Sequence, residues 1–132
     1  MSRLLLDTTF LIDAERGSEP PEDLIAPTDD VAISAITAAE LLFGVEAARG
    51  RTRNARAAFV TELLETVPIL SYDLAIATEH ARLLTAVRRS GRPRGAHDLI
   101  IAATAAATGR IVVTADAESF DGLPGVSVRR HR

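Results

Sequence analysis

Short apolar runs alternate with longer helical patterns along the chain, and this alternation limits the fold more than any other feature. The expected strands cover residues 4–6, 31–33, 68–70, 111–113 and 126–128, and the expected helices cover 8–16, 37–48, 54–67, 74–87 and 96–108. Strands that alternate with helices form parallel sheets with helices packed on their faces. We therefore predict an α/β fold with a central, mostly parallel sheet of four to five strands flanked by helices.

The length and composition fit one globular domain. The chain has 132 residues, of which 47% are apolar and 25% charged, so we assign residues 1–132 to a single domain. Cysteine is absent, which excludes a disulfide framework and a cysteine zinc site. The sequence shows neither a signal-peptide pattern nor an apolar run of about 20 residues. We therefore expect a cytoplasmic protein without a membrane interaction.

Four acidic residues fall where the expected elements bring them to one edge of the sheet. Asp7 and Asp116 follow the first and fourth strands. Glu40 is expected in the first turn of the helix after the second strand, and Asp98 in the first turn of an apolar helix. Taken singly, Asp7 suits a helix N-cap, and Thr37-x-x-Glu40 is a capping-box pattern. The helix dipole favours Asp98 in a first turn, and an aspartate such as Asp116 is ordinary in a loop.

Taken together, these four carboxylates predict a metal site. Binding sites of open parallel sheets form beyond the carboxyl ends of the strands, which is where the four side chains are expected. Clustered carboxylates repel one another unless a cation lies between them. Mg²⁺ and Mn²⁺ take oxygen ligands, and acidic clusters that hold them serve metal-assisted hydrolysis of phosphodiesters.

Four stretches of the chain carry motifs that occur together: LDTTFLI at 6–12, ITAAELLFGV at 36–45, AHDLIIAA at 96–103, and TAD at 114–116 with Phe120 and LPGV at 123–126. In this order they resemble the motifs of PIN-domain ribonucleases, and among these the chain is most similar to VapC-type toxins of type II (VapBC) toxin–antitoxin pairs. The four stretches span nearly the whole chain. All four acidic positions match, whereas Ala115 stands where the family more often has Arg or Asn.

The resemblance implies a PIN-like three-layer fold and a Mg²⁺-dependent endoribonuclease, with Mn²⁺ as a possible substitute. One or two ions would be held by Asp7, Glu40, Asp98 and Asp116, and would orient a water for in-line attack on the scissile phosphate. Asp7 and Asp98 are the expected direct ligands, and either Glu40 or Asp116 accepts the proton of the water. The resemblance also implies a VapB-type antitoxin, docked on the helix pair 37–67, and a homodimer. The sequence does not identify which RNA is cut.

Four further residues are candidates for substrate binding. The hydroxyls of Thr8 and Thr114 are expected to bind carboxylates or phosphate, with capping of a helix or loop as the alternative. Arg92 and Arg94 precede the helix of Asp98 and are expected to contact RNA phosphates, with a solvated helix end as the alternative. For the tail 129–132, a frayed, solvated terminus is favoured over an RNA contact.

Two other functions compete with the nuclease. A phosphatase of the haloacid-dehalogenase type also begins with a strand-end aspartate like Asp7, but that family has a second aspartate where this chain has Thr9. A catalytically silent RNA- or protein-binding PIN-like module is the other alternative. The complete set of four acids argues against it, because a binding module gains nothing from clustered like charges. Thermal stabilisation by Mg²⁺ or Mn²⁺ separates the nuclease from such a module.

Overall fold

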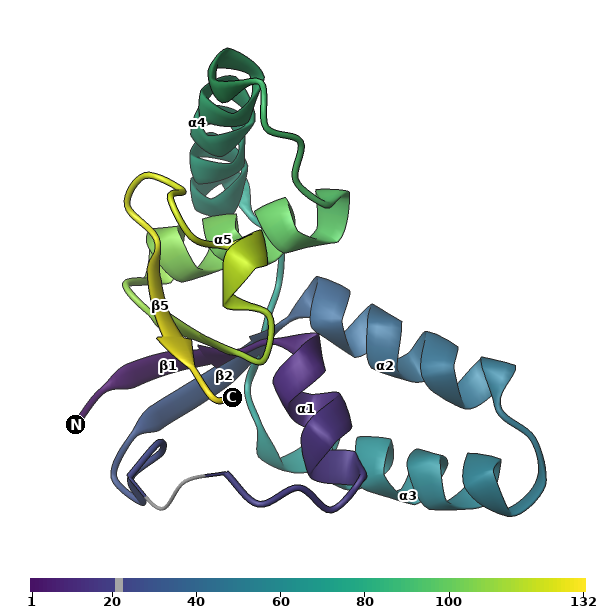
Figure 1. Ribbon diagram of the computed structural model, residues 1–132. Helices are drawn as coiled ribbons and strands as arrows, with labels where there is room; N and C mark the ends of the chain where they lie inside the picture. The colour runs from purple at the N-terminus through teal and green to yellow at the C-terminus, as the bar shows by residue number, and fades with distance from the viewer. Residues whose placement is uncertain (21–22) are drawn as a thin grey trace.

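A single sheet of five parallel strands forms the centre of the computed structural model, which describes residues 1–20 and 23–132 (Figure 1). The strands lie in the order β3-β2-β1-β4-β5. They are β1 (Arg3–Leu6), β2 (Asp30–Ser34), β3 (Ile69–Leu70), β4 (Ile111–Thr114) and β5 (Ser127–Arg130). The helices are α1 (Thr8–Glu15), α2 (Ala35–Ala47), α3 (Gly50–Thr66), α4 (Leu74–Ser90), α5 (Ala96–Thr108) and the 3₁₀ turn η1 (Ala117–Ser119).

The central strand β1 is buried on both faces, which explains its continuous run of leucines. Because side chains alternate along a strand, Leu5 points to one face and Leu4 and Leu6 point to the other. Leu5 belongs to the core under α4 and α5, and Leu4 and Leu6 belong to the core under α1, α2 and α3. The molecule therefore has three layers, helix on sheet on helix, as predicted.

The ends of the helices follow local capping chemistry. Asp73 accepts a hydrogen bond from the backbone N–H of Ile76 and so caps α4, as expected. Helix α5 ends at Thr108 and is followed by Gly109, whose φ of 65° suits a glycine after a helix. Helix α2, in contrast, begins two residues earlier than predicted, because Ser34 accepts from the N–H of Ile36.

Successive strands are added first on one side of β1 and then on the other, so the strand order reverses direction beside β1. The chain proceeds from β1 outward through β2 to β3, and then returns to β4 and β5 on the other side of β1. The carboxyl ends of β1 and β4 are adjacent, since Leu6 pairs with Val113 and the N–H of Asp7 donates to the carbonyl of Val113 at 2.9 Å. Open parallel sheets bind their ligands at such a point.

The C-terminal tail is ordered against the sheet, so the expected frayed terminus is wrong. Strand β5 continues to Arg130, and the next N–H, that of His131, donates to the carbonyl of Thr114 at 2.9 Å. The His131 ring packs edge-on against Phe10 and lies 2.8 Å from a carboxylate oxygen of Asp13. In the described part of the chain, none of the helices combines the length and the hydropathy that a membrane span requires.

Candidate active site

Asp7 sits at the centre of the site, at the carboxyl end of β1, and its side chain is held by two threonine hydroxyls. Asp7 is 2% exposed. Its Oδ2 accepts from Thr9 Oγ1 at 2.8 Å and from Thr114 Oγ1 at 2.7 Å. Asp7 stands at the N-cap position of α1, but its side chain makes no capping hydrogen bond. Its carboxylate therefore accepts from the hydroxyls of Thr9 in α1 and Thr114 in β4 rather than from a backbone N–H of the helix.

The same two hydroxyls fix the loop that follows β4. Thr9 Oγ1 accepts from the N–H of Ala115 at 3.0 Å, and Thr114 Oγ1 accepts from the N–H of Asp116 at 2.9 Å. Each hydroxyl thus joins the Asp7 carboxylate to the backbone beside Asp116. Hydroxyl donors of this kind stabilise a buried carboxylate. Each hydroxyl oxygen also accepts a hydrogen bond from a backbone N–H, so both its donor and its acceptor capacity are satisfied.

Glu40 reaches the site from the second turn of α2. Thr8 Oγ1 donates to Glu40 Oε1 at 2.9 Å and lies 3.3 Å from the buried hydroxyl of Thr37. The capping-box interpretation of Thr37 and Glu40 is wrong, because Ser34 is the N-cap and both residues lie inside the helix. The Nδ1 of His97 lies 3.7 Å from the other carboxylate oxygen of Glu40, so His97 borders the site.

Asp98 and Asp116 face the site from two segments that lie close together. Asp98 is in the first turn of α5, and a Cβ added to the N-cap residue Gly95 would lie 2.7 Å from Asp98 Oδ2. Glycine at this position therefore leaves room for the carboxylate. The Asp116 carboxylate accepts from Ser119 Oγ at 2.6 Å, across the η1 turn.

The electrostatics of the site appear in the pKa of Asp98, which is raised to about 6. Burial is the largest cause, followed by the negative charges of Asp7, Asp116 and Glu40, while the nearby Ser119 hydroxyl acts in the opposite direction. Each of the other three carboxylates is thus close enough to disfavour the ionised form of Asp98. The structure brings the four predicted acids together at one edge of the sheet.

The donor set fits a hard divalent cation in chemistry and in charge. All four candidate ligands are carboxylates, and their mutual repulsion is the kind that a cation relieves. Within residues 1–20 and 23–132, no group of three or more acidic or histidine side chains is arranged closely enough to hold a metal ion by itself. An open arrangement is compatible with Mg²⁺, which keeps several waters and uses few protein ligands.

The four predicted substrate-binding residues have different surroundings. Thr8 and Thr114 both donate to carboxylates of the site. Arg92 is exposed and lines an open groove that also contains Asp116 and Ser119. Arg94 lines the same groove, but its guanidinium donates to backbone carbonyls of the segment 118–121.

Two residues that hydrogen-bond the aspartates of the site, Thr9 and Ser119, were missed by the sequence analysis. Thr9 follows Asp7 by two residues in the Asp-Thr-Thr run, and that spacing was the available signal for a hydroxyl turned back toward the carboxylate. Ser119 follows Asp116 by three residues, which is also a spacing that allows a local hydrogen bond. Both spacings are common in loops and helix starts, so neither was specific.

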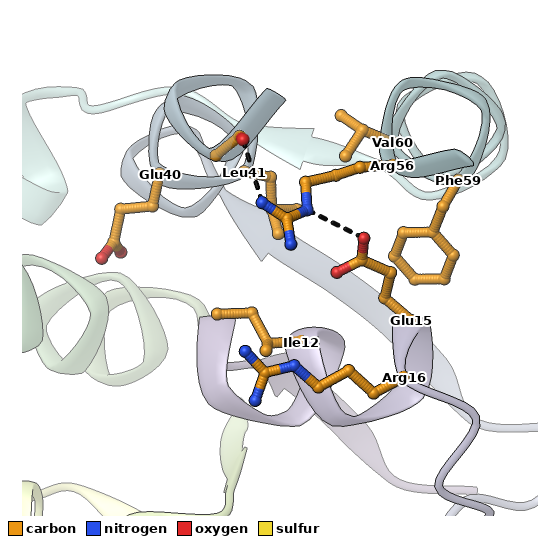
Figure 2. Close-up of a pocket in the computed structure, with 9 residues that line it drawn as sticks. Ile12, Glu15, Arg16, Glu40, Leu41, Arg56, Phe59 and Val60 are labelled. Carbon is orange, nitrogen blue, oxygen red and sulfur yellow. Dashed lines mark hydrogen bonds and ion pairs between the residues drawn. The ribbon is translucent and has the colours of Figure 1, made fainter. Parts of the chain in front are cut away.

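A second concavity lies beside the acidic cluster, between α1, α2 and α3 (Figure 2). Its apolar part is formed by Ile12, Leu41, Phe59 and Val60. Its charged part contains Arg16 and the ion pair of Arg56 with Glu15, whose atoms lie 2.9 Å apart. Glu40 also lines this groove, so the groove opens toward the carboxylates.

Known proteins resemble this chain over nearly its full length. The sequence profile of the PIN domain matches residues 4–125. The chain is 35% identical to Ribonuclease VapC5 of Mycobacterium tuberculosis over 128 residues, which cover 96% of this chain and 93% of the relative. It is 32% identical to the tRNA(fMet)-specific endonuclease VapC of Shigella flexneri, over 96% of each protein.

The fold agrees with solved toxin–antitoxin complexes. The crystal structure of DNA-bound VapBC from Salmonella typhimurium contains a chain that matches this one with a TM-score of 0.85 and 26% identity, over 100% of both chains. The matching chain of VapBC-5 from Mycobacterium tuberculosis has a TM-score of 0.83 and 33% identity, with 98% of this chain covered and 99% of that one.

Proposed function

This chain belongs to the VapC family of PIN-domain ribonucleases, and from that membership we propose that it is a Mg²⁺-dependent endoribonuclease acting in the cytoplasm as the toxin of a toxin–antitoxin pair. The observation that carries the proposal is the convergence of four carboxylates at the switch point of the sheet, where burial and then the charges of the other three raise the pKa of Asp98. A cluster of this kind is suited to a cation and to a phosphodiester substrate.

Some residues of the site would bind the ion, and others orient the residues that bind it. Asp7, Glu40, Asp98 and Asp116 would bind the ion, Asp7 in the orientation that the hydroxyls of Thr9 and Thr114 impose. When bound, a divalent cation offsets the charge of the scissile phosphate and lowers the pKa of water at the site.

The antitoxin would occupy the groove between α1, α2 and α3. The groove combines an apolar floor with Arg16 at its rim, so it suits a segment that inserts apolar side chains and carries an acidic residue. Because Glu40 borders both the groove and the acidic cluster, an occupant of the groove lies next to the site. We propose that a VapB-type antitoxin inhibits the nuclease from this position.

The proposal is tested by inducing the wild-type chain in cells, beside Asp7→Asn and Asp98→Asn at equal protein levels, and mapping cellular RNA ends. Glu62→Gln, on the exposed surface of α3, is the matched control. We expect growth arrest with discrete new RNA ends in the wild type and the control, and neither in the two aspartate variants. Arrest that persists in both aspartate variants would instead support a catalytically silent RNA- or protein-binding module.

The antitoxin site is tested with two matched phenylalanine variants. Phe59→Glu changes the groove, whereas Phe43→Glu changes a side chain of α2 that is 72% exposed. We expect Phe59→Glu to lose co-purification with the VapB-type antitoxin of its pair while Phe43→Glu retains it. Retention by both variants would refute the groove as the antitoxin site.

A further inference from the structure

Arg94 makes an unusual set of contacts for a loop arginine. Its Nη1 donates to the carbonyl of Ser119 at 3.0 Å and lies 3.5 Å from that of Glu118, and its Nη2 donates to the carbonyl of Asp121 at 2.5 Å. These acceptors are 24 to 27 residues further along the chain. One guanidinium thus joins the segment before α5 to the segment after β4.

The three acceptor carbonyls lie at the end of η1 and just after it. The N–H groups of Phe120 and Asp121, which follow η1, both donate to the carbonyl of Ala117. The carbonyls at the end of such a turn carry partial negative charge and need donors from elsewhere. The turn is also anchored to the core, because Phe120 is fully buried. The hydrogen bonds of Arg94 hold the solvent-facing carbonyls of the same turn.

Each segment joined by Arg94 carries one acid of the site. Arg94 directly precedes Gly95, the N-cap of the helix that bears Asp98. On the other side, Arg94 holds the backbone of Ser119, whose hydroxyl donates to the Asp116 carboxylate at 2.6 Å. A continuous series of contacts therefore leads from the start of α5 through Arg94 and Ser119 to Asp116.

We propose that Arg94 is a positioning residue that acts through Ser119 and sets the placement of Asp116 relative to Asp98. The inference rests on the proposed function, because it concerns the same metal site. It differs from the expectation that Arg94 contacts RNA, since its guanidinium is engaged with three carbonyls of its own chain.

The geometry requires arginine rather than any cation. The guanidinium presents several N–H donors in a rigid fork, so two of its nitrogens reach different carbonyls at the same time. A lysine ammonium carries the same charge as a compact point on a flexible stem. Arg94→Lys is therefore expected to keep the charge of the loop but to lose most of the fixation.

The test separates a positioning role from a phosphate contact by two measurements on the same proteins. Mn²⁺ affinity is measured by calorimetry on the full chain, and binding of a single-stranded RNA is measured in EDTA across a series of salt concentrations. The variants are Arg94→Ala, Arg94→Lys and the neighbouring control Arg92→Ala. Thermal melting in EDTA establishes that each variant is folded.

We expect Arg94→Ala to weaken Mn²⁺ binding about tenfold, the lower range for loss of a residue that orients a metal ligand. Arg94→Lys should fall close to Arg94→Ala. Neither should change the salt dependence of RNA binding. Arg92→Ala should show the reverse, with wild-type Mn²⁺ affinity and a log–log salt slope lower by about 0.7, the value for one phosphate contact on a single strand.

Ser119→Ala provides a second, smaller perturbation in case Arg94→Ala does not fold. It removes only the hydroxyl through which Arg94 acts, so it should also weaken Mn²⁺ binding, and the double variant should be no weaker than Arg94→Ala. Wild-type Mn²⁺ affinity in both single variants would overturn the inference, as would a reduced salt slope in Arg94→Ala. Absence of Mn²⁺ binding by the wild-type chain would instead overturn the proposed function on which the inference rests.

Discussion

Replacing Thr114 by valine tests the arrangement around Asp7 with almost no change in shape. Thr114 is fully buried, and its hydroxyl donates to Asp7 Oδ2 at 2.7 Å and accepts from the N–H of Asp116 at 2.9 Å. A hydrogen bond to a charged group contributes about 1.5–3 kcal/mol, and a buried group left without its partner adds to the cost. We therefore expect the free energy of unfolding to fall by about 3 kcal/mol. Urea denaturation of the metal-free protein should show this as a midpoint lower by about 1.5 M, at a slope of about 2 kcal/mol/M.

Thr104 supplies a matched control for this experiment. It is 1% exposed, and its hydroxyl donates only to the carbonyl of Ile100 within α5. That carbonyl is also a helix acceptor, so Thr104→Val leaves no buried group without a partner and should cost about 1 kcal/mol or less. Equal losses for Thr104→Val and Thr114→Val would refute the argument that Thr114 stabilises a buried carboxylate.

Three further predictions concern charge, the C-terminal tail and assembly. The pKa of Asp98 is raised to about 6 from 3.8. The folded metal-free protein therefore loses stability as pH rises from 4 through 6, because Asp98 must ionise in its unfavourable surroundings. Asp98→Asn removes this ionisation, so it should raise the melting temperature in EDTA at pH 8 and leave it unchanged at pH 4. His131→Ala removes the contacts with Phe10 and Asp13 and should lower the melting temperature by about 5 °C. An unchanged melting temperature would show that these contacts do not stabilise the fold, as for a frayed terminus. The expected homodimer would cover apolar side chains near edge strand β3, where Leu74 is 82% exposed; Leu74→Glu should then give a monomer by light scattering, and a monomeric wild type would contradict it.

Local chemistry explains which parts of the fold were predictable. The bounds of α5 were predicted correctly because an apolar run is followed by Gly109, which takes a left-handed conformation. The start of α2 was misplaced because two capping signals compete within a few residues. Ser34 is the N-cap in the structure. Thr37 and Glu40 do not cap the helix and instead contact Thr8 of α1.

Contacts between distant segments account for what the sequence analysis did not reach. The acids were located because each follows a strand or lies within the first two turns of a helix at the same edge of the sheet. The partners that orient them depend on tertiary contacts, as when Thr114 meets Asp7 across 107 residues or Arg94 meets Ser119 across 25. No local pattern distinguishes Arg94 from Arg92, although only Arg92 leaves its guanidinium without a hydrogen bond among the described residues.

The most direct test of the account is cleavage of RNA by the purified chain as Mg²⁺ is titrated, with Asp7→Asn alongside. The account predicts discrete products that appear with Mg²⁺, disappear in EDTA, return when Mn²⁺ is added, and never form with Asp7→Asn. Cleavage that continues in EDTA, or that Asp7→Asn performs at the wild-type rate, would contradict a metal-dependent site built on the four carboxylates.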